Sequence, residues 1–231
     1  MIENYKKYLV VVAHPDDETL GCGGTLKKLT KLKKNVKVIF IAEGTSCRFK
    51  KPFDKEKVQE LILKRKKMAI SALKELGVKR YHFYDLECGK LKSLPPIMIA
   101  KIIEKEIKLF QPEILITHSN YDVNTDHKSI YQACLQSSRP TKKGKVIKGL
   151  LSFEILSSTE WKYNKVFEPN IFINIEKEIN FKIKALKKYT SEICKFPHPR
   201  SVEGIKSLAK YRGMQSSLRF SEAFKLIRLF S

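Results

Sequence analysis

Long apolar runs are absent from this 231-residue chain. A membrane-spanning helix requires about 20 consecutive, mostly apolar residues, and no stretch of the sequence approaches that length. The apolar run at residues 9–13 is short for a signal peptide, and it leads into His14 and acidic residues instead of a small-residue cleavage site. We therefore expect no membrane span, and we expect a cytoplasmic protein.

Cysteine, glycine and proline are scarce, and each scarcity excludes a class of protein. The 10 glycines and 9 prolines, against 42% hydrophobic residues, indicate a globular chain and not a disordered one. The cysteines are odd in number and include no Cys-x-x-Cys pair, which excludes a disulfide framework and a thiolate zinc site. We expect buried free thiols at Cys22, Cys47, Cys88, Cys134 and Cys194.

Arginine is also scarce, although the chain is strongly basic. Lysine and arginine total 46 against 24 acidic residues, a net charge of +22, yet only eight of the basic residues are arginine. Arginine is the residue that contacts bases and phosphates through paired hydrogen bonds, and no nucleic-acid-binding motif is present. We interpret the charge as a lysine-rich solvated surface and expect no nucleic-acid partner. An anionic small-molecule substrate is compatible with it.

Short β-branched runs alternate with longer amphipathic segments through the first two thirds of the chain. This alternation predicts a mostly parallel sheet with right-handed crossovers. We expect an α/β fold, a Rossmann-like three-layer sandwich with helices on both faces of the sheet, as a single domain over residues 1–231. The expected strands are Tyr8–Val12, Val36–Ile41, Tyr81–Tyr84 and Ile114–Thr117, and the expected helices are Leu20–Lys33, Lys55–Leu76 and Pro96–Phe110.

The last third of the chain is predicted to add two strands and then to become helical. A helix at Asp126–Ser138 precedes strands at Leu150–Leu156 and Ile171–Ile175. No internal repeat, low-complexity tract or long linker divides the chain. The expected C-terminal helices are Glu176–Cys194, Ser201–Arg212 and a last segment near Ser221–Leu229.

The first expected strand ends in His14-Pro15-Asp16-Asp17-Glu18. Open α/β sheets place their active sites beyond the carboxyl ends of strands, and histidine with nearby carboxylates suits zinc or another divalent transition metal. Two adjacent aspartates allow one to hold a metal while the other transfers protons. The alternative is a plain helix cap, for which aspartate is common. Gly21, Gly23 and Gly24 follow without the order of a nucleotide-binding loop, and we expect them to allow close helix packing.

A second polar cluster, Thr117 to His127, also follows an apolar strand and leads into a helix. Two of the five histidines of the chain lie in it, and a third is His14. Both clusters therefore fall at the carboxyl ends of strands in one predicted sheet. They converge in one crevice if the first and fourth strands are near neighbours.

The motif Ala13-His14-Pro15-Asp16-Asp17-Glu18, followed by Asp126-His127, resembles the PIG-L/LmbE-like family of zinc-dependent N-acetylglucosaminyl deacetylases. The resemblance extends over nearly the whole chain. It implies a hydrolase that removes an acetyl group from an N-acetylated sugar or sugar conjugate, with Zn²⁺ or another divalent transition metal as cofactor. Further stretches that resemble a bacterial branch of the family lie at residues 86–95, 153–161, 196–201 and 221–224.

The resemblance also implies a role for each residue of the two motifs. His14, Asp17 and His127 match the metal ligands of the family, and three protein ligands with an open position are typical of a catalytic zinc. Asp16 matches the general base, which would take a proton from zinc-bound water as that water becomes the nucleophile. Asp126 is expected to orient a ligand histidine.

One departure from the family pattern concerns Asn124, which stands where better-studied members carry a histidine. Asparagine can donate a hydrogen bond to an oxyanion but cannot deliver a proton, so another group must act as the acid. Our first candidate is His198 and our second is His118. The alternatives are an ordinary loop histidine for His198 and a structural hydrogen-bonding role for His118.

Two arginines are candidates for contact with an anionic part of the substrate. Arg48 follows the second strand and Arg200 lies beside His198, although each could equally form a surface salt bridge. Two other functions stay open: a metal-dependent amidase acting on a non-sugar N-acyl metabolite, and a basic nucleic-acid or membrane-surface binder with a vestigial site. The oligomeric state is open as well, with a homo-oligomer among the outcomes.

Overall fold

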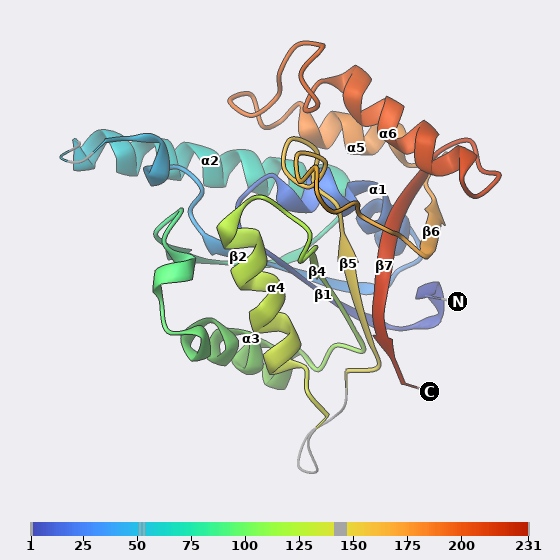
Figure 1. Ribbon diagram of the computed structural model, residues 1–231, viewed down its shortest axis with the longest axis horizontal. Helices are drawn as coiled ribbons and strands as arrows, with labels where there is room; N and C mark the ends of the chain where they lie inside the picture. Colours follow the sequence, from blue (N-terminus) through green and yellow to red (C-terminus); the bar gives the residue numbers. More distant parts are fainter. Residues whose placement is uncertain (1, 51, 53, 141–146, 231) are drawn as a thin grey trace.

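A seven-stranded sheet forms the centre of the computed structural model, which describes residues 2–50, 52, 54–140 and 147–230 (Figure 1). The order of the strands across the sheet is β3-β2-β1-β4-β5-β7-β6. The strands are β1 (Lys7–Val12), β2 (Asn35–Ala42), β3 (Arg80–Leu86), β4 (Ile114–His118), β5 (Gly149–Phe153), β6 (Ile171–Asn174) and β7 (Ser221–Leu229).

Strand β1 lies between β2 and β4, and both pairings are parallel. Val10 is opposite Val38 on one side and Ile116 on the other. The carboxyl ends of β1 and β4 therefore meet at the same edge of the sheet, as the sequence predicted. Strand β7 runs antiparallel between β5 and β6, so the sheet is mostly parallel with an antiparallel side.

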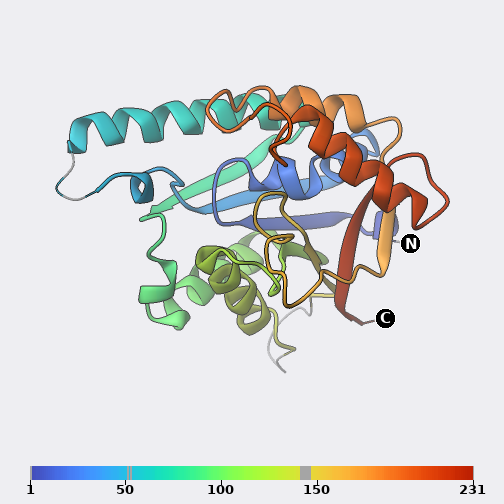
Figure 2. The same ribbon diagram turned by 45° about the horizontal axis from the view of Figure 1, so that its top comes forward.

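Helices cover both faces of the sheet and make three layers, which confirms the predicted fold class (Figure 2). The helices are α1 (Asp17–Lys31), α2 (Lys55–Leu76), α3 (Pro96–Phe110), α4 (Thr125–Ser137), α5 (Ile179–Leu186) and α6 (Val202–Met214), with short 3-10 turns η1 (Ile2–Asn4), η2 (Ser46–Arg48) and η3 (Leu91–Ser93). Helices α1, α2, α5 and α6 pack on one face, and α3 and α4 pack on the other. No helix in the described ranges combines the length and the apolarity that a bilayer crossing requires.

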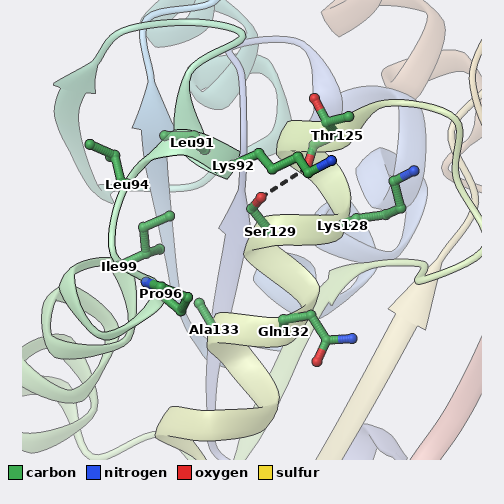
Figure 3. A pocket seen from close by; sticks show the side chains of 10 residues that line it. All are labelled: Leu91, Lys92, Leu94, Pro96, Ile99, Thr125, Lys128, Ser129, Gln132 and Ala133. Atoms are coloured by element: carbon green, nitrogen blue, oxygen red, sulfur yellow. Dashed lines mark hydrogen bonds between the residues drawn. The ribbon is translucent and has the colours of Figure 1, made fainter.

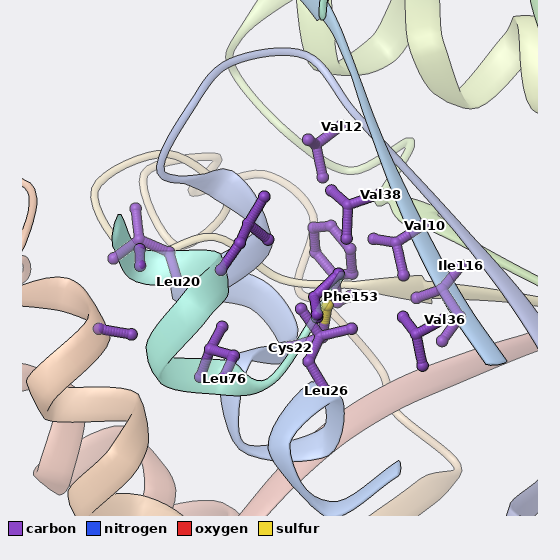
Figure 4. Close-up of a cluster of buried hydrophobic side chains, with 14 of the residues drawn as sticks. Val10, Val12, Leu20, Cys22, Leu26, Val36, Val38, Leu76, Ile116 and Phe153 are labelled. Atoms are coloured by element: carbon purple, nitrogen blue, oxygen red, sulfur yellow. The ribbon is translucent and has the colours of Figure 1, made fainter. Parts of the chain in front are cut away.

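The core consists of two apolar layers, one on each face of the sheet. Tyr8, Val10 and Val12 point into the larger layer, which includes Leu26 and Phe153 (Figure 4). The alternate residues of β1 point into the other layer, against α3 and α4. Because both faces of β1 are covered, the strand is apolar at every position from Tyr8 to Val12, as is typical of central parallel strands.

The prediction of a helix near Ser221–Leu229 was wrong, because this segment is strand β7. Phe224 is opposite Phe153 of β5 and Ile171 of β6, so the strand joins the two halves of this side of the sheet. Phe224 and Leu226, two residues apart, pack into the larger core layer. Pairing with two strands overrides a local sequence that alone favours no single structure.

The long helix expected over Glu176–Cys194 was also wrong, since α5 covers only Ile179–Leu186. The chain turns after α5 and carries two side chains inward: the Tyr189 hydroxyl donates to Glu18 Oε1 at 2.7 Å, and Glu192 pairs with arginines. The segment after α5 thus places two polar groups inside the fold.

The glycines of α1 allow the helix to lie close to the sheet, as expected. A Cβ atom at Gly21 would lie 2.4 Å from the Phe153 ring, and one at Gly24 would lie 2.8 Å from Ile175 Cγ2. At Gly23 the nearest atom is 3.3 Å away and belongs to the flexible Lys182 side chain. Only two of the three glycines are therefore required by close packing.

We predict that Gly21→Ala lowers the free energy of unfolding by about 1–3 kcal/mol, because the added methyl group overpacks the core against Phe153. Gly23→Ala is the matched control. Its methyl group meets only a side chain that can move, and alanine favours the helix by about 1 kcal/mol. Denaturant unfolding of both variants measures the difference, and equal stabilities would contradict the packing argument.

Candidate metal centre and active site

The two polar clusters predicted to converge do lie together at the carboxyl ends of β1 and β4. One ligand atom from each of His14, Asp17 and His127 lies within 4.8 Å of the others, and all three residues are buried. Asp17 Oδ2 is 3.5 Å from His14 Nδ1 and 3.4 Å from His127 Nε2. The structure thus brings together the three residues that match the family's ligands, from segments more than a hundred residues apart.

The turn between β1 and α1 places the two aspartates differently. Asp17 Oδ2 accepts the backbone N–H of His14 at 2.8 Å, so its carboxylate stays beside the strand end. Asp16 has φ 131°, a backbone conformation that costs a non-glycine residue about 1–3 kcal/mol. Its side chain makes no capping hydrogen bond to α1. The helix-cap alternative therefore does not describe Asp16.

Glu18, the last residue of the motif, holds this strained turn. Its carboxylate is fully buried and accepts hydrogen bonds from the Asp16 backbone N–H at 3.1 Å and the Tyr189 hydroxyl at 2.7 Å. Burial raises the pKa of Glu18 to about 7. Glu18 thus has a structural role, because its carboxylate joins the Asp16 backbone to the Tyr189 side chain.

Each candidate histidine ligand has a carboxylate on its other ring nitrogen. His14 Nε2 is 3.0 Å from Asp126 Oδ2, and Asp126 in turn accepts the backbone N–H of Gly89 at 2.6 Å and of Leu91 at 3.2 Å. Asp126 therefore contacts His14 and not its neighbour His127. Such partners fix the ring orientation and the tautomer of a ligand histidine.

Asp122 is the corresponding partner of His127, and the sequence analysis did not single it out. Asp122 Oδ2 is 3.0 Å from His127 Nδ1, and the hydroxyl groups of Ser158 and Thr159 donate to the same carboxylate. Burial opposes protonation of His127, but Asp17 and Asp122 raise its pKa to about 10. The signal in the sequence was an acidic residue inside the second motif, five positions before the histidine.

The residues present fit a bound divalent metal. His127 Nε2 is buried and makes no hydrogen bond to any residue that the structure describes. Two imidazole nitrogens and one carboxylate are a donor set that zinc and similar metals accept, with a position left for water or substrate. A second combination, His14, Cys88 and Asp126, also brings its atoms within 4.8 Å. The Asp126 oxygens in it already accept two backbone hydrogen bonds, which favours the first combination.

Asp16 lies between two arginines. Its Oδ2 atom is 2.9 Å from Arg200 and 3.2 Å from Arg65, and both arginines also contact Glu192. Burial raises the pKa of Asp16 above its ordinary value, against the opposing effect of Arg65 and Arg200. A buried carboxylate with a raised pKa beside a metal-ligand cluster has the properties of a proton acceptor.

Arg65 was missed by the sequence analysis, although a signal was present. It lies on α2 between Ile62 and Ala69, in the apolar stripe that faces the core, and it is 4% exposed. Its guanidinium group donates to the carbonyl oxygens of Pro15 at 2.9 Å and Gly44 at 2.6 Å. A lone arginine in a buried stripe indicates a charged partner inside the fold.

The two arginines that the sequence did single out occupy different positions. Arg200 reaches Asp16, as described, and also donates to the Ser157 hydroxyl at 2.6 Å. Arg48 pairs with Glu192 through two hydrogen bonds of 2.9 and 2.8 Å, and its side chain is 47% exposed. A cavity of about 300 Å³ beside this network is lined by residues that include Thr45, Arg48, Arg65 and Glu192.

His118 and His198, the candidates for the acid, and Asn124, the candidate for the oxyanion contact, each make a hydrogen bond to the backbone. His118 Nε2 accepts the Ala13 backbone N–H at 2.9 Å, and burial lowers the pKa of His118 to about 3. His198 Nδ1 accepts the backbone N–H of Arg200 at 3.1 Å, so His198 shares a turn with the arginine that reaches Asp16. The Asn124 side-chain oxygen caps α4 through the Asp126 N–H at 2.9 Å, which leaves its amide group as a donor.

A second hollow of about 300 Å³ lies against α4 and is mostly apolar (Figure 3). It is bounded by η3, α3 and α4, and Figure 3 shows Leu94, Ile99 and Ala133 around it. None of the three candidate ligands lines it. None of them lines the cavity near Arg48 either, but that cavity is lined by Arg65, which contacts Asp16.

Comparison with known proteins agrees with this geometry. The family described as PIG-L, GlcNAc-PI de-N-acetylase, matches residues 9–138, which include both polar clusters. That match covers more than half of the chain, and the protein belongs to the PIG-L family. A diacetylchitobiose deacetylase of Thermococcus kodakarensis is 25% identical over 96% of this chain and 83% of its own length.

Solved structures share the fold. An N,N'-diacetylchitobiose deacetylase of Pyrococcus horikoshii superimposes with a TM-score of 0.78 at 20% identity, over 98% of this chain and 85% of its own. A 4-carboxy-2-hydroxymuconate hydratase of Pseudomonas putida has a TM-score of 0.74 at 20% identity, over 98% of each chain. Because a deacetylase and a hydratase share this fold, the reaction has to be argued from the site.

We predict that Asp122→Asn weakens metal binding by about 10–100-fold, because His127 loses its charged partner. Competition with a chelator measures the affinity of the purified protein for Zn²⁺. Asp85→Asn, which removes the same charge from a surface residue, is the control and should leave the affinity unchanged. Equal affinities for both variants would show that Asp122 does not support the metal.

Proposed function

We propose that this protein is a metal-dependent N-deacetylase that removes the acetyl group from an N-acetylated sugar or sugar conjugate. One observation carries the proposal: His14, Asp17 and His127 converge, His127 Nε2 is buried without a hydrogen bond to any described residue, and the Asp16 side chain of the same turn does not cap the helix. Membership of the PIG-L family supports the reaction class. The activity named for the Thermococcus relative supports an N-acetylated sugar as the substrate.

His14, Asp17 and His127 would hold the metal. A Zn²⁺ ion bound there supplies a Lewis acid that polarises a carbonyl group and makes water acidic near neutral pH. Asp126 and Asp122 keep the two imidazole rings oriented from behind. Because His14 follows β1, Asp17 begins α1 and His127 lies in α4, which follows β4, the sheet beneath these elements fixes their separation.

Asp16 would accept the proton of the attacking water, and the burial that raises its pKa favours proton transfer to it. Arg65 and Arg200 contact Asp16 Oδ2 and prevent the carboxylate from turning to the helix N-terminus. The Asn124 amide is a donor that can stabilise the oxyanion of the tetrahedral intermediate. His198, in the Arg200 turn, would protonate the leaving amine.

The cavity lined by Arg48, Arg65 and Glu192 adjoins the arginine network around Asp16 and offers room for the remainder of the substrate. Arg48, at its rim, is half exposed and can exchange part of its contact with Glu192 for an anionic group. An assay of amine release from free, phosphorylated, nucleotide-linked, inositol-linked and lipid-linked N-acetylhexosamines tests the proposal. N-acyl compounds without a sugar belong in the same assay, and hydrolysis of those alone would overturn the sugar assignment.

We predict that Asp16→Asn keeps the metal but lowers kcat by about 10²–10⁴-fold, because the amide cannot accept the proton. Metal analysis and acetate release from the best substrate of the panel measure the two properties. Asp54→Asn is the control, because that aspartate caps α2 on the surface and asparagine also caps helices. Full activity of Asp16→Asn would disprove its role as the base.

We predict that His198→Ala lowers kcat and removes the alkaline limb of its pH profile, because the leaving amine loses its proton donor. His82→Ala, at an exposed position of β3, is the control. The measurement is kcat against pH on one substrate. An unchanged profile in the His198 variant would eliminate it as the acid and leave the proposed metal site intact.

A further inference from the structure

Two cysteines approach each other beside the metal centre. Cys47 lies in η2, after β2, and Cys88 lies in the turn after β3. The two strands are neighbours in the sheet, so their carboxyl-end turns meet. The two sulfur atoms are 2.7 Å apart. All five cysteines are free thiols as expected, but Cys47 and Cys194 are exposed, which corrects the prediction that they are buried.

The two turns are connected to the candidate ligands through hydrogen bonds. Glu43 accepts the backbone N–H groups of Cys88 at 2.8 Å and Thr45 at 2.6 Å, so one carboxylate joins both turns. The next residue, Gly89, donates its N–H to Asp126, the partner of His14. The Cys88 sulfur itself is within 4.8 Å of ligand atoms of both. The thiol pair therefore lies at the rim of the metal centre.

We propose that Cys47 and Cys88 form a reversible disulfide bond when the protein meets a peroxide. Neither the chemistry of deacetylation nor the ligand set requires this pair. The exposed Cys47 is accessible to a small oxidant, while Cys88 is only 5% exposed and is held against it. The hydrogen bond with Cys88 lowers the pKa of Cys47 to about 7, which makes Cys47 the more reactive thiol.

The oxidation proceeds in two balanced steps. The Cys47 thiolate attacks a peroxide oxygen and breaks the O–O bond, which leaves a sulfenic acid on Cys47 and, with hydrogen peroxide, releases hydroxide that takes up a proton. The Cys88 sulfur then attacks the Cys47 sulfur, the S–S bond forms, and water leaves with the proton of Cys88. The two thiols lose two electrons, and the peroxide is reduced to two molecules of water. An added dithiol reverses the bond by exchange.

The disulfide bond would tether the turn that carries Gly89 to the turn after β2. Local opening of the Gly89 turn, which would release Asp126 from its backbone donors, then becomes harder. We therefore expect the oxidised protein to lose bound Zn²⁺ to a chelator several-fold more slowly than the reduced protein. Its melting temperature should be higher by about 5 °C.

The test treats the full-length zinc-loaded protein with a small excess of hydrogen peroxide and maps disulfide-linked peptides by mass spectrometry. We expect a 47–88 linkage that a dithiol removes. Cys47→Ser should abolish it, whereas Cys194→Ser, at the other exposed cysteine, should not. The proposal is overturned if both thiols stay open to alkylation after treatment, or if Cys47 instead pairs with Cys194.

The chelator and melting measurements show whether the 47–88 disulfide bond, once formed, affects the metal site. Oxidised wild type is compared with reduced wild type and with peroxide-treated Cys47→Ser. Slower zinc loss and a higher melting temperature in oxidised wild type alone support the proposal. The same changes in Cys47→Ser would assign them to another residue and overturn it. None of these readouts depends on the substrate, so a failed deacetylase assay would leave this test intact.

Discussion

The parallel pairing of β1 with β4 is the constraint on which the site depends. Tyr8, Leu9 and Val10 pair with residues 114–116, and this register sets the distance between the ends of the two strands. A shift of one residue would exchange the side chains that face the two core layers and move His14 relative to His127. The close packing of those side chains in both layers opposes such a shift. The chemistry at the edge is therefore held by the hydrophobic core beneath it.

Buried charge is the second theme, because all four aspartates of the two motifs lie inside the fold. Each has partners: Asp17 the histidines, Asp126 two backbone N–H groups, Asp122 two hydroxyls, and Asp16 two arginines. Removing one partner from such a group costs more than the pair contributes to stability, because the remaining charge is uncompensated. Of these four, only Asp16 combines its partners with a strained backbone and a raised pKa, which supports the proposal that it transfers the proton.

The sequence predicted the layers, the parallel sheet and the convergence of His14, Asp17 and His127, because these follow from strand periodicity and from polar residues at strand ends. It did not predict that Ser221–Leu229 is a strand, because that choice depends on β5 and β6, which are distant in sequence. Nor did it reveal the Arg65 contact with Asp16. Side-chain partners brought together by tertiary packing leave a weak trace in one sequence, here an arginine in an apolar stripe.

Strand β7 also determines the order in which the molecule can assemble. Strand β6 meets the sheet through β7, and Glu222 of β7 accepts the backbone N–H groups of Gly24 and Thr25 in α1 at 2.8 and 2.7 Å. The helix that follows the His-Pro-Asp-Asp motif thus acquires its last buried partner from a segment made nearly two hundred residues later. During synthesis the ligand-bearing strands would be complete long before the sheet is. Contacts of such long range delay folding, so the nascent chain would expose an unfinished sheet edge until its final strand emerges.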